Sequence, residues 1–141
     1  LRFDDSFTYL IKTDDEIDKE NTLIPTMMIQ PLAENAIWHG LIPKKGKKKL
    51  SIYFSALGET ITCTIEDNGI GIKHSQQLKC LNRPLHKSVG LSNLHNRIKL
   101  INEKYNTNCT LEIIDLGDLN SNKTGCRAVL SFNININKPD L

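Results

Sequence analysis

The chain of 141 residues has the length of one ordinary domain, enough to bury a hydrophobic core without disulfide bonds or a structural metal. Hydrophobic residues make up 39% and charged residues 24%, which excludes an intrinsically disordered chain and a membrane-embedded one. The net charge of +2 gives no strong electrostatic attraction to nucleic acid or to an anionic membrane.

The first half of the chain is predicted to form a strand, a helix and a hairpin. Apolar and polar residues alternate from 7 to 11, which predicts a half-buried strand. Apolar residues from 26 to 40 recur with a helical period, and Pro31 predicts a kinked first turn or a regular helix that begins at Pro31 itself. After the basic loop PKKGKKK, alternating runs at 50–56 and 61–65 flank the turn LGET and predict a β-hairpin.

The second half is predicted to form a long loop, a helix and two strands. Residues 73–88 mix Lys, Gln, Asn, Pro and Ser without periodicity, and loops of this length in compact domains are usually functional lids. Apolar residues from 91 to 105 mark a helix with Ser92 as its predicted N-cap. Strands are predicted at 109–115 and 125–136. This order predicts an α+β fold with helices layered on one face of a sheet.

Cysteine spacing and the chain start bear on cellular context. Cys63, Cys80, Cys109 and Cys126 are widely spaced and form no C-x-x-C pair, so we interpret them as reduced thiols of a cytoplasmic domain. No window approaches the roughly 18 to 20 apolar residues of a membrane span. Because the chain begins at Leu1, we expect it to be a piece of a longer protein whose membrane anchor, if any, lies upstream.

The stretch IEDNGIGI, residues 65–72, places an acid, an amide and two glycines directly after a strand. Taken alone it predicts only a tight turn, because Asn-Gly is a common turn dipeptide. A carboxylate only accepts hydrogen bonds, so Asp67 suits a ligand that presents an amino group. The glycines would let a flat ring lie against the backbone.

The stretch SVGLSNL, residues 88–94, places a glycine immediately before the second helix. Helix N-termini carry unpaired N–H groups and the positive end of the helix dipole, which favour anions. Taken alone, the stretch is equally typical of an ordinary helix start.

The stretch QPLAENAIWHG places Asn35 and His39 four residues apart along one border of the apolar stripe of the first helix. The amide oxygen of Asn35 is a suitable ligand for Mg2+, which keeps most of its waters and bridges to phosphates. Taken singly, Asn35 is equally well a surface asparagine and His39 a packed or solvated histidine.

The order of these three motifs resembles the N-box, G1 box and G2 box of the GHKL ATP-binding fold, shared by sensor histidine kinases, gyrase and MutL-type ATPases. IPTMMIQPLAENAIWHG, DNGIGI and VGLSNLHNRI together resemble the catalytic domain of LytS-type sensor histidine kinases, from about Arg2 to Ile134. The resemblance implies a two-layer α/β sandwich of the GHKL (Bergerat) type, with a mixed sheet and helices on one face. It also implies that residues 1–141 form a single catalytic ATP-binding domain.

The resemblance further implies a site for ATP and Mg2+. Asn35 would be the Mg2+ ligand, and Asp67 would accept the adenine amino group. His39 would lie near the phosphates, with catalytic roles for Asn35 and His39 and at most a supporting one for Glu34. The other implied nucleotide-binding residues are Asn68, Gly69, Gly71 and Ile72 in the pocket, Lys87 and Ser88 at the lid, and Gly90, Leu91, Asn93 and Arg97 at the second helix.

Three residues depart from the family pattern. Trp38 stands where the family often carries Lys, so Lys87 or the lysines at 44–49 become candidates for a phosphate contact. Ser88 replaces the usual first glycine of the G2 box. Cys126 stands where Thr is common, and a thiol is a poor substitute for a hydroxyl in a hydrogen bond.

The function implied is transfer of the ATP γ-phosphoryl group to a histidine on an upstream dimerisation helix, in a membrane-anchored homodimer that signals to a response regulator. No histidine here lies in a PHFLFN-like acceptor segment, so we expect the chain to bind ATP without phosphorylating itself.

Three alternatives stay open. A degenerate nucleotide-binding or interaction module is motivated by the departures from the family pattern. A GHKL ATPase is disfavoured because Pro31 stands where those hydrolases carry a water-activating glutamate. Nucleic-acid binding through PKKGKKK is disfavoured because no aromatic residues interleave with the lysines, so we expect no nucleic-acid partner.

Overall fold

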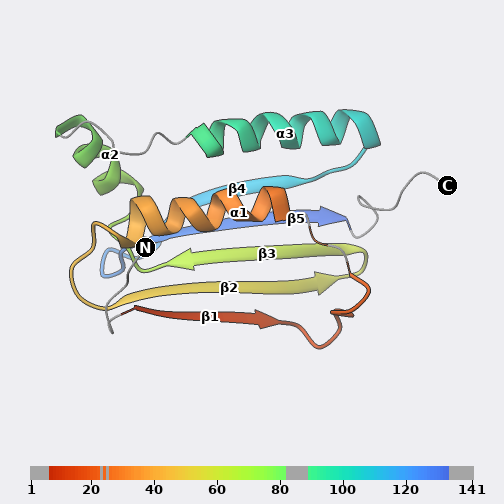
Figure 1. Cartoon of the computed structure of the whole chain (residues 1–141), viewed down its shortest axis with the longest axis horizontal. Coiled ribbons are helices and arrows are strands. Elements are labelled where there is room, and N and C mark those ends of the chain that lie inside the picture. The colour runs from red at the N-terminus through yellow and green to blue at the C-terminus, as the bar shows by residue number, and fades with distance from the viewer. Residues whose placement is uncertain (1–6, 23, 25, 82–88, 134–141) are drawn as a thin grey trace.

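The computed structural model describes residues 7–22, 24, 26–81 and 89–133. Within these ranges five strands form one mixed sheet in the order β1-β2-β3-β5-β4 (Figure 1). β1 runs parallel to β2, and the other neighbouring strands are antiparallel. The strands are β1 (Phe7–Thr13), β2 (Lys48–Leu57), β3 (Thr60–Asp67), β4 (Thr110–Asp115) and β5 (Cys126–Asn133).

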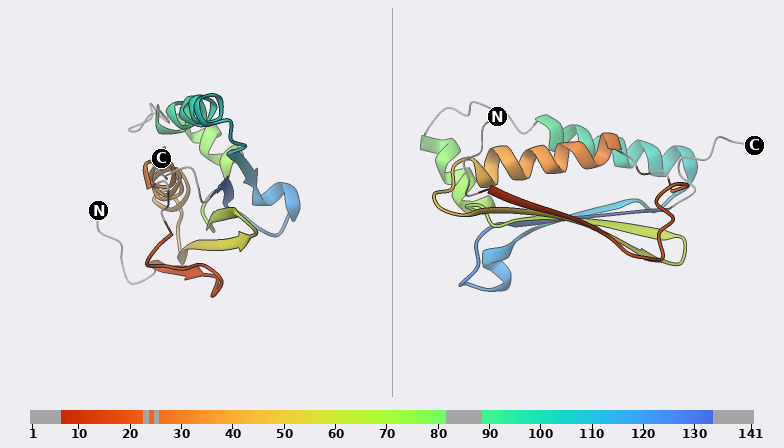
Figure 2. Two further views of the ribbon diagram at one scale, coloured as in Figure 1. Left: turned by 90° about the vertical axis from the view of Figure 1, so that its right-hand side faces the viewer. Right: turned by 60° about the horizontal axis from the view of Figure 1, so that its bottom comes forward.

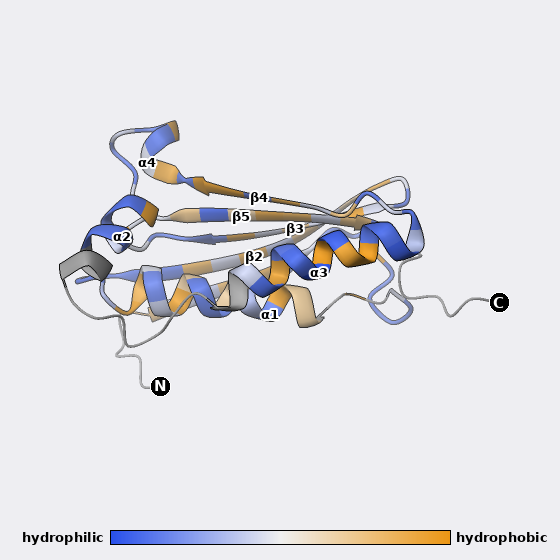
Figure 3. Ribbon diagram, turned by 90° about the horizontal axis from the view of Figure 1, so that it is seen from above, coloured by the Kyte–Doolittle hydropathy of each residue, from blue (hydrophilic) through white to orange (hydrophobic). Residues whose placement is uncertain are grey.

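Two long helical segments cover one face of this sheet (Figure 2). They are α1 (Thr26–Asn35), which continues into the π-helical turn η1 (Ala36–Leu41), and α3 (Val89–Tyr105). Figure 3 shows hydrophobic and hydrophilic positions alternating along α1 and α3, as expected for amphipathic helices. α2 (Ile72–Leu81) lies at one end of the sheet, and the short α4 (Leu116–Leu119) projects there on the side away from α1 and α3. The predicted α+β fold with helices on one face is confirmed.

The core lies between the helical layer and the sheet. β3 shows why the layers separate cleanly: its sequence TITCTIED alternates threonines with apolar residues, and its odd-numbered positions are buried. Ile61, Cys63 and Ile65 of β3 pack in one cluster with Leu32 of α1 and Leu94 of α3. The predicted hairpin of β2 and β3 is confirmed in its pairing and its turn.

The first strand and the first helix differ from prediction. Tyr9 and Ile11 were expected on a half-buried strand but are 71% and 59% exposed, because β1 is the edge strand of the sheet. α1 begins at Thr26 and passes through Pro31, so the prediction that regular helix begins at Pro31 is wrong.

The region after β3 also differs from prediction. The loop predicted at 73–88 is helical at its start, because α2 occupies Ile72–Leu81, and residues 82–88 lie outside the described ranges. α3 is already helical at Val89, so Ser92 lies inside it and is not its N-cap. Of the described helices, none combines the length and the apolar character needed to cross a bilayer.

Candidate functional site

A cavity of about 310 Å³ lies at the end of the sheet beside α2, where several elements meet. Asp67 ends β3, and the following turn leads into α2. The described residues that line the cavity are Asn35, His39, Gly40, Asp67, Gly71, Ile72, Ser75, Gln76, Ile113 and Cys126. Two of the three motifs that the sequence singled out, QPLAENAIWHG and IEDNGIGI, therefore supply residues that line this cavity.

Asp67 is the polar centre of the cavity. Its side chain is only 2% exposed, and its carboxylate accepts hydrogen bonds from the backbone N–H groups of Gly69, at 2.8 Å, and of Cys126. Burial raises the pKa of Asp67 to about 6, against the two backbone hydrogen bonds, which lower it. At neutral pH the group is therefore mainly a charged acceptor inside an otherwise weakly polar cavity.

The glycines around Asp67 are required by close packing. A Cβ built on Gly69 would lie 2.3 Å from the carbonyl carbon and oxygen of Gly40, and a Cβ on Gly40 would lie 2.7 Å from a carboxylate oxygen of Asp67. The N–H of Ile70 donates to the carbonyl oxygen of Gly40 at 3.1 Å. Gly71 has a φ of +85°, which favours glycine. The turn after β3 is thus fitted against η1 backbone to backbone.

The end of the first helix carries two polar side chains into the cavity. Asn35 and His39 are both half-buried there. The wider π-helical turn is seen in the hydrogen bond from the N–H of Ile42 to the carbonyl oxygen of Ile37, at 2.9 Å. Glu34 does not line the cavity; it is exposed and accepts a hydrogen bond from Nε2 of Gln30 at 2.9 Å.

Asn68, predicted to shape the pocket, instead ties the turn to the lysine loop. Its side-chain oxygen accepts from the N–H of Lys49 at 2.7 Å, and its side-chain nitrogen donates to the carbonyl oxygen of Lys47 at 3.1 Å. Nζ of Lys44 donates to the Asn68 carbonyl oxygen. The amide therefore holds two loops together, while the neighbouring Asp67 turns into the cavity.

Neither Asn93 nor Arg97 lines the cavity, although both were predicted to bind nucleotide from α3. Gly90 and Leu91 lie in its first turn, and the Asn93 side chain is exposed. Nη1 of Arg97 donates to the carbonyl oxygen of Met27 on α1 at 2.8 Å. Lys87 and Ser88 lie outside the described residues.

Four lining residues were missed by sequence reasoning. Gly40 was noted only as a member of the helical stripe, and Ser75 and Gln76 lie in the segment predicted to be an unstructured loop. Ile113 had only the inward-facing alternation of its strand as a signal. The departure at Cys126 was noted, and the structure does bring this thiol into the wall of the cavity. Burial, with the negative charges of Asp67 and Asp115, raises the pKa of the Cys126 thiol to about 12.

No protein-family model matches the chain. Its sequence is 38% identical over 102 residues to the sensor histidine kinase YpdA of Escherichia coli (strain K12), and the match spans 71% of the chain but only 17% of that kinase. The chain resembles the histidine kinase domain of a blue-light activated kinase from Erythrobacter litoralis, with a TM-score of 0.57 at 12% identity over 93% of the chain and 53% of that protein.

A second structural likeness is to histidine kinase ThkA, solved in complex with the response regulator protein TrrA. The TM-score is 0.53 at 15% identity, over 95% of the chain and 36% of the matched protein. Both likenesses confirm the predicted GHKL-type fold. The chain is thus similar in sequence to part of a sensor histidine kinase, and its fold is that of histidine kinase domains of known structure.

Proposed function

We propose that the cavity around Asp67 binds ATP with Mg2+, and that the chain is the single catalytic domain of a LytS-type sensor histidine kinase. In the full protein it would transfer the γ-phosphoryl group of ATP to a histidine on an upstream dimerisation helix. The observation that carries the proposal is the buried, charged acceptor Asp67 in a cavity of about 310 Å³, a volume typical of small-molecule sites.

The cavity suits an adenine ring. The carboxylate of Asp67 can accept the exocyclic amino group, which is the feature that distinguishes adenine from guanine at this position. Ile72 and Ile113 supply apolar walls, and Gly71, which also lines the cavity, has no side chain to keep a flat ring from its backbone. The carboxylate of Asp67 is buried and charged, so a ligand that adds a donor to the two backbone N–H groups already bonded to it gains affinity.

The residues near Asp67 also fit a magnesium–phosphate group. Mg2+ takes one or two protein oxygen ligands and fills its remaining positions with water and phosphate oxygens. The side-chain oxygen of Asn35 is one protein ligand that the cavity offers, and His39 lies one helical turn further along η1 and also lines the cavity. When bound, Mg2+ would neutralise charge on the phosphates. The chain's own contribution is to orient the nucleotide and to keep water from the adenine end.

The partners follow from the kinase assignment. The phosphoacceptor would be supplied by the dimerisation helices of a membrane-anchored homodimer, with this domain on the cytoplasmic side. The ThkA complex supports a response regulator as the downstream partner. The LytS-type class is supported by the spacing of the QPLAENAIWHG, DNGIGI and VGLSNLHNRI motifs.

One competing function has an observation in its favour. Cys126 places a thiol in the cavity wall, and this thiol makes the site less polar than a hydroxyl would. A nucleotide-binding module without kinase activity would fit that wall equally well. A chain extended upstream through the acceptor helix separates the two: the kinase forms phosphohistidine from labelled ATP, whereas the module binds ATP and never becomes labelled.

Binding itself is tested by calorimetry with a non-hydrolysable ATP analogue and Mg2+. We expect binding to the wild-type chain and at least about tenfold weaker binding to Asp67→Asn. Asp18→Asn is the matched control, because Asp18 is an exposed carboxylate bonded within its own loop, to Glu20 and Asn21. Absence of binding to the wild type, or equal binding to Asp67→Asn, would refute the assignment.

A further inference from the structure

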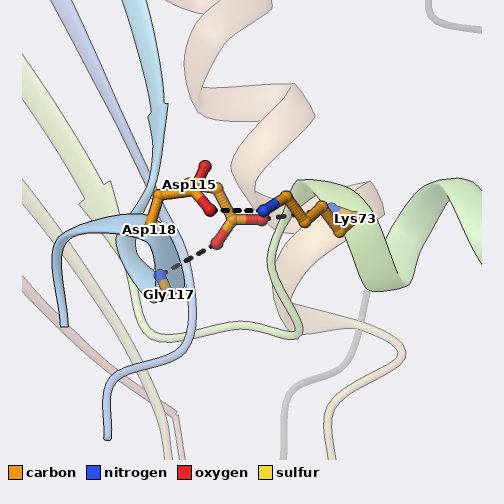
Figure 4. Close-up of polar contacts among 4 residues, drawn as sticks. All are labelled: Lys73, Asp115, Gly117 and Asp118. Atoms are coloured by element: carbon orange, nitrogen blue, oxygen red, sulfur yellow. Dashed lines mark hydrogen bonds and ion pairs between the residues drawn. The ribbon is translucent and has the colours of Figure 1, made fainter. Parts of the chain in front are cut away.

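Asp115, the last residue of β4, joins the starts of two helices. Its carboxylate accepts from the backbone N–H of Lys73 at 3.1 Å and from that of Gly117 at 2.9 Å (Figure 4), and also from the N–H of Ile72. Ile72 and Lys73 begin α2, and Gly117 lies in the first turn of α4. One carboxylate thus caps both helices, in the way that an N-cap aspartate normally caps one.

The surroundings of Asp115 are shaped for this double role. A Cβ on Gly71 would lie 3.2 Å from both carboxylate oxygens, and a Cβ on Gly117 would lie 3.1 Å from one of them. Burial raises the pKa of Asp115, but hydrogen bonds from the N–H groups of Lys73, Gly117 and Ile72 outweigh it, so the pKa lies below its usual range. The group is therefore charged at neutral pH, which strengthens each hydrogen bond that it accepts.

A second link runs beside the first. Nζ of Lys73 forms an ion pair with Asp118 of α4 (Figure 4). The two side chains are 71% and 54% exposed, and ion pairs this open contribute little to stability. Of the two links between α2 and the β4–α4 segment, the hydrogen bonds from backbone N–H groups to the Asp115 carboxylate are therefore the stronger.

The position of α2 matters because this helix forms one wall of the cavity. Ile72, Ser75 and Gln76 all line it. From Ile72 to Gln77, none of the α2 side chains is buried, so the described part of the helix has little core packing to hold it. Ile113 also lines the cavity, and it precedes Asp115 by two residues on β4. The cap thus links α2 to the end of β4, and both elements supply residues that line the cavity.

We infer that Asp115 is a positioning residue of the nucleotide site, which holds the first turn of α2 so that Ile72, Ser75 and Gln76 stay at the cavity wall. The inference rests on the proposed function for the identity of the ligand. Its structural part, the anchoring of α2, is independent of that function and can be measured without nucleotide.

The test compares the wild-type chain with Asp115→Ala, Asp115→Asn and the matched control Asp118→Asn. Amide hydrogen exchange is followed by mass spectrometry, and affinity for the ATP analogue with Mg2+ by calorimetry. In Asp115→Ala, exchange over residues 72–76 should be about five- to tenfold faster, with unchanged protection in β3 and β5, and binding should weaken by a similar factor. Asp115→Asn, which keeps an acceptor oxygen, should fall between Asp115→Ala and the wild type.

Asp118→Asn should match the wild type in both measurements. Unchanged α2 exchange in Asp115→Ala, or faster exchange with unchanged affinity, would overturn the inference. If Asp115→Ala loses protection throughout the sheet, the variant is destabilised as a whole and the test rests on Asp115→Asn. Exchange and affinity equal to those of the wild type in Asp115→Asn would then overturn the inference. Failure of the wild type to bind the analogue would refute the proposed function, while the exchange data would still report on the anchoring of α2.

Discussion

Arg97 of α3 supplies a hydrogen bond that Pro31 of α1 cannot. Proline has no backbone N–H, so the carbonyl of Met27, four residues earlier, loses its partner within the helix. Nη1 of Arg97 donates to that carbonyl oxygen at 2.8 Å. The contact explains how α1 continues through Pro31, and it links α1 to α3 within the helical layer.

This relationship predicts a coupling between the two residues. Arg97→Ala should lower the free energy of unfolding by about 1 kcal/mol, because the Met27 carbonyl loses a charged donor at a partly exposed site. In a Pro31→Ala background the helix can donate its own N–H to that carbonyl, so Arg97→Ala should cost less. Urea denaturation of the four proteins of this double-mutant cycle gives the coupling. Equal cost of Arg97→Ala in both backgrounds would contradict the account.

The turn beside Asp67 leaves no room for a side chain at Gly69. An alanine there would bring its Cβ to 2.3 Å from backbone atoms of Gly40, so one of the two segments must shift. We expect Gly69→Ala to lower the free energy of unfolding by about 2 to 3 kcal/mol. Gly46→Ala is the comparison, because its Cβ would meet no atom within 4 Å and only its φ of +89° adds strain, worth about 1 kcal/mol. Thermal unfolding measures both variants. A smaller loss of stability in Gly69→Ala than in Gly46→Ala would contradict the close packing of Gly69 against Gly40.

Asp67 predicts a pH dependence of stability. Its pKa is raised from 3.8 to about 6 on folding, so the folded state binds the proton more tightly than the unfolded state. Its contribution to stability is complete below pH 4 and is lost as the pH rises through 6. That loss amounts to about 3 kcal/mol. Relative to wild type, Asp67→Asn should therefore gain stability between pH 4 and pH 6 and hold that gain above it.

The measurement is urea denaturation of both proteins at several pH values from 4 to 7. Asp118→Asn, which removes an exposed carboxyl of α4, serves as the control and should show no comparable trend. A constant difference between Asp67→Asn and wild type over this range would show that burial does not perturb Asp67.

The thiol of Cys126 should react slowly with alkylating reagents, although it lies in the cavity wall. With a pKa of about 12 instead of 9, its thiolate fraction at pH 8 is about a thousandfold below that of an ordinary cysteine. Iodoacetamide at pH 8, followed by peptide mass spectrometry, should therefore modify Cys126 far more slowly in the folded chain than in urea. Asp67→Asn should accelerate the reaction, since it removes a neighbouring negative charge. Equal rates in folded and unfolded chains would contradict this description.

Much of the fold was readable from local pattern. The β2–β3 hairpin has strict alternation and a short turn, and both features depend only on neighbouring residues. α2 was missed because residues 72–81 carry little apolar periodicity, and its start is set by Asp115, 43 positions after Ile72 in the chain. The exposure of Tyr9 and Ile11 was missed for a related reason, since alternation does not reveal that a strand lies at a sheet edge.

The residues of the candidate site that belong to a sequence motif could be predicted. Asp67, Asn35 and His39 belong to motifs that the resemblance to the GHKL family assigned to one site, and all three line the cavity. Ser75 and Ile113 reach it only through the packing of α2 and the register of the sheet, which no short motif encodes. Asn68 shows the opposite case, because its place in the motif suggested a pocket role while its side chain bonds the lysine loop.

The most direct test is whether Asp67 reads the amino group of adenine. Calorimetry with Mg2+ should show ADP binding the wild-type chain at least about tenfold tighter than IDP, whose base carries an oxygen where adenine has the amino group. In Asp67→Asn this preference should disappear, mainly through weaker binding of ADP. Equal affinity of the wild type for the two nucleotides, or an undiminished preference for ADP in Asp67→Asn, would contradict the account.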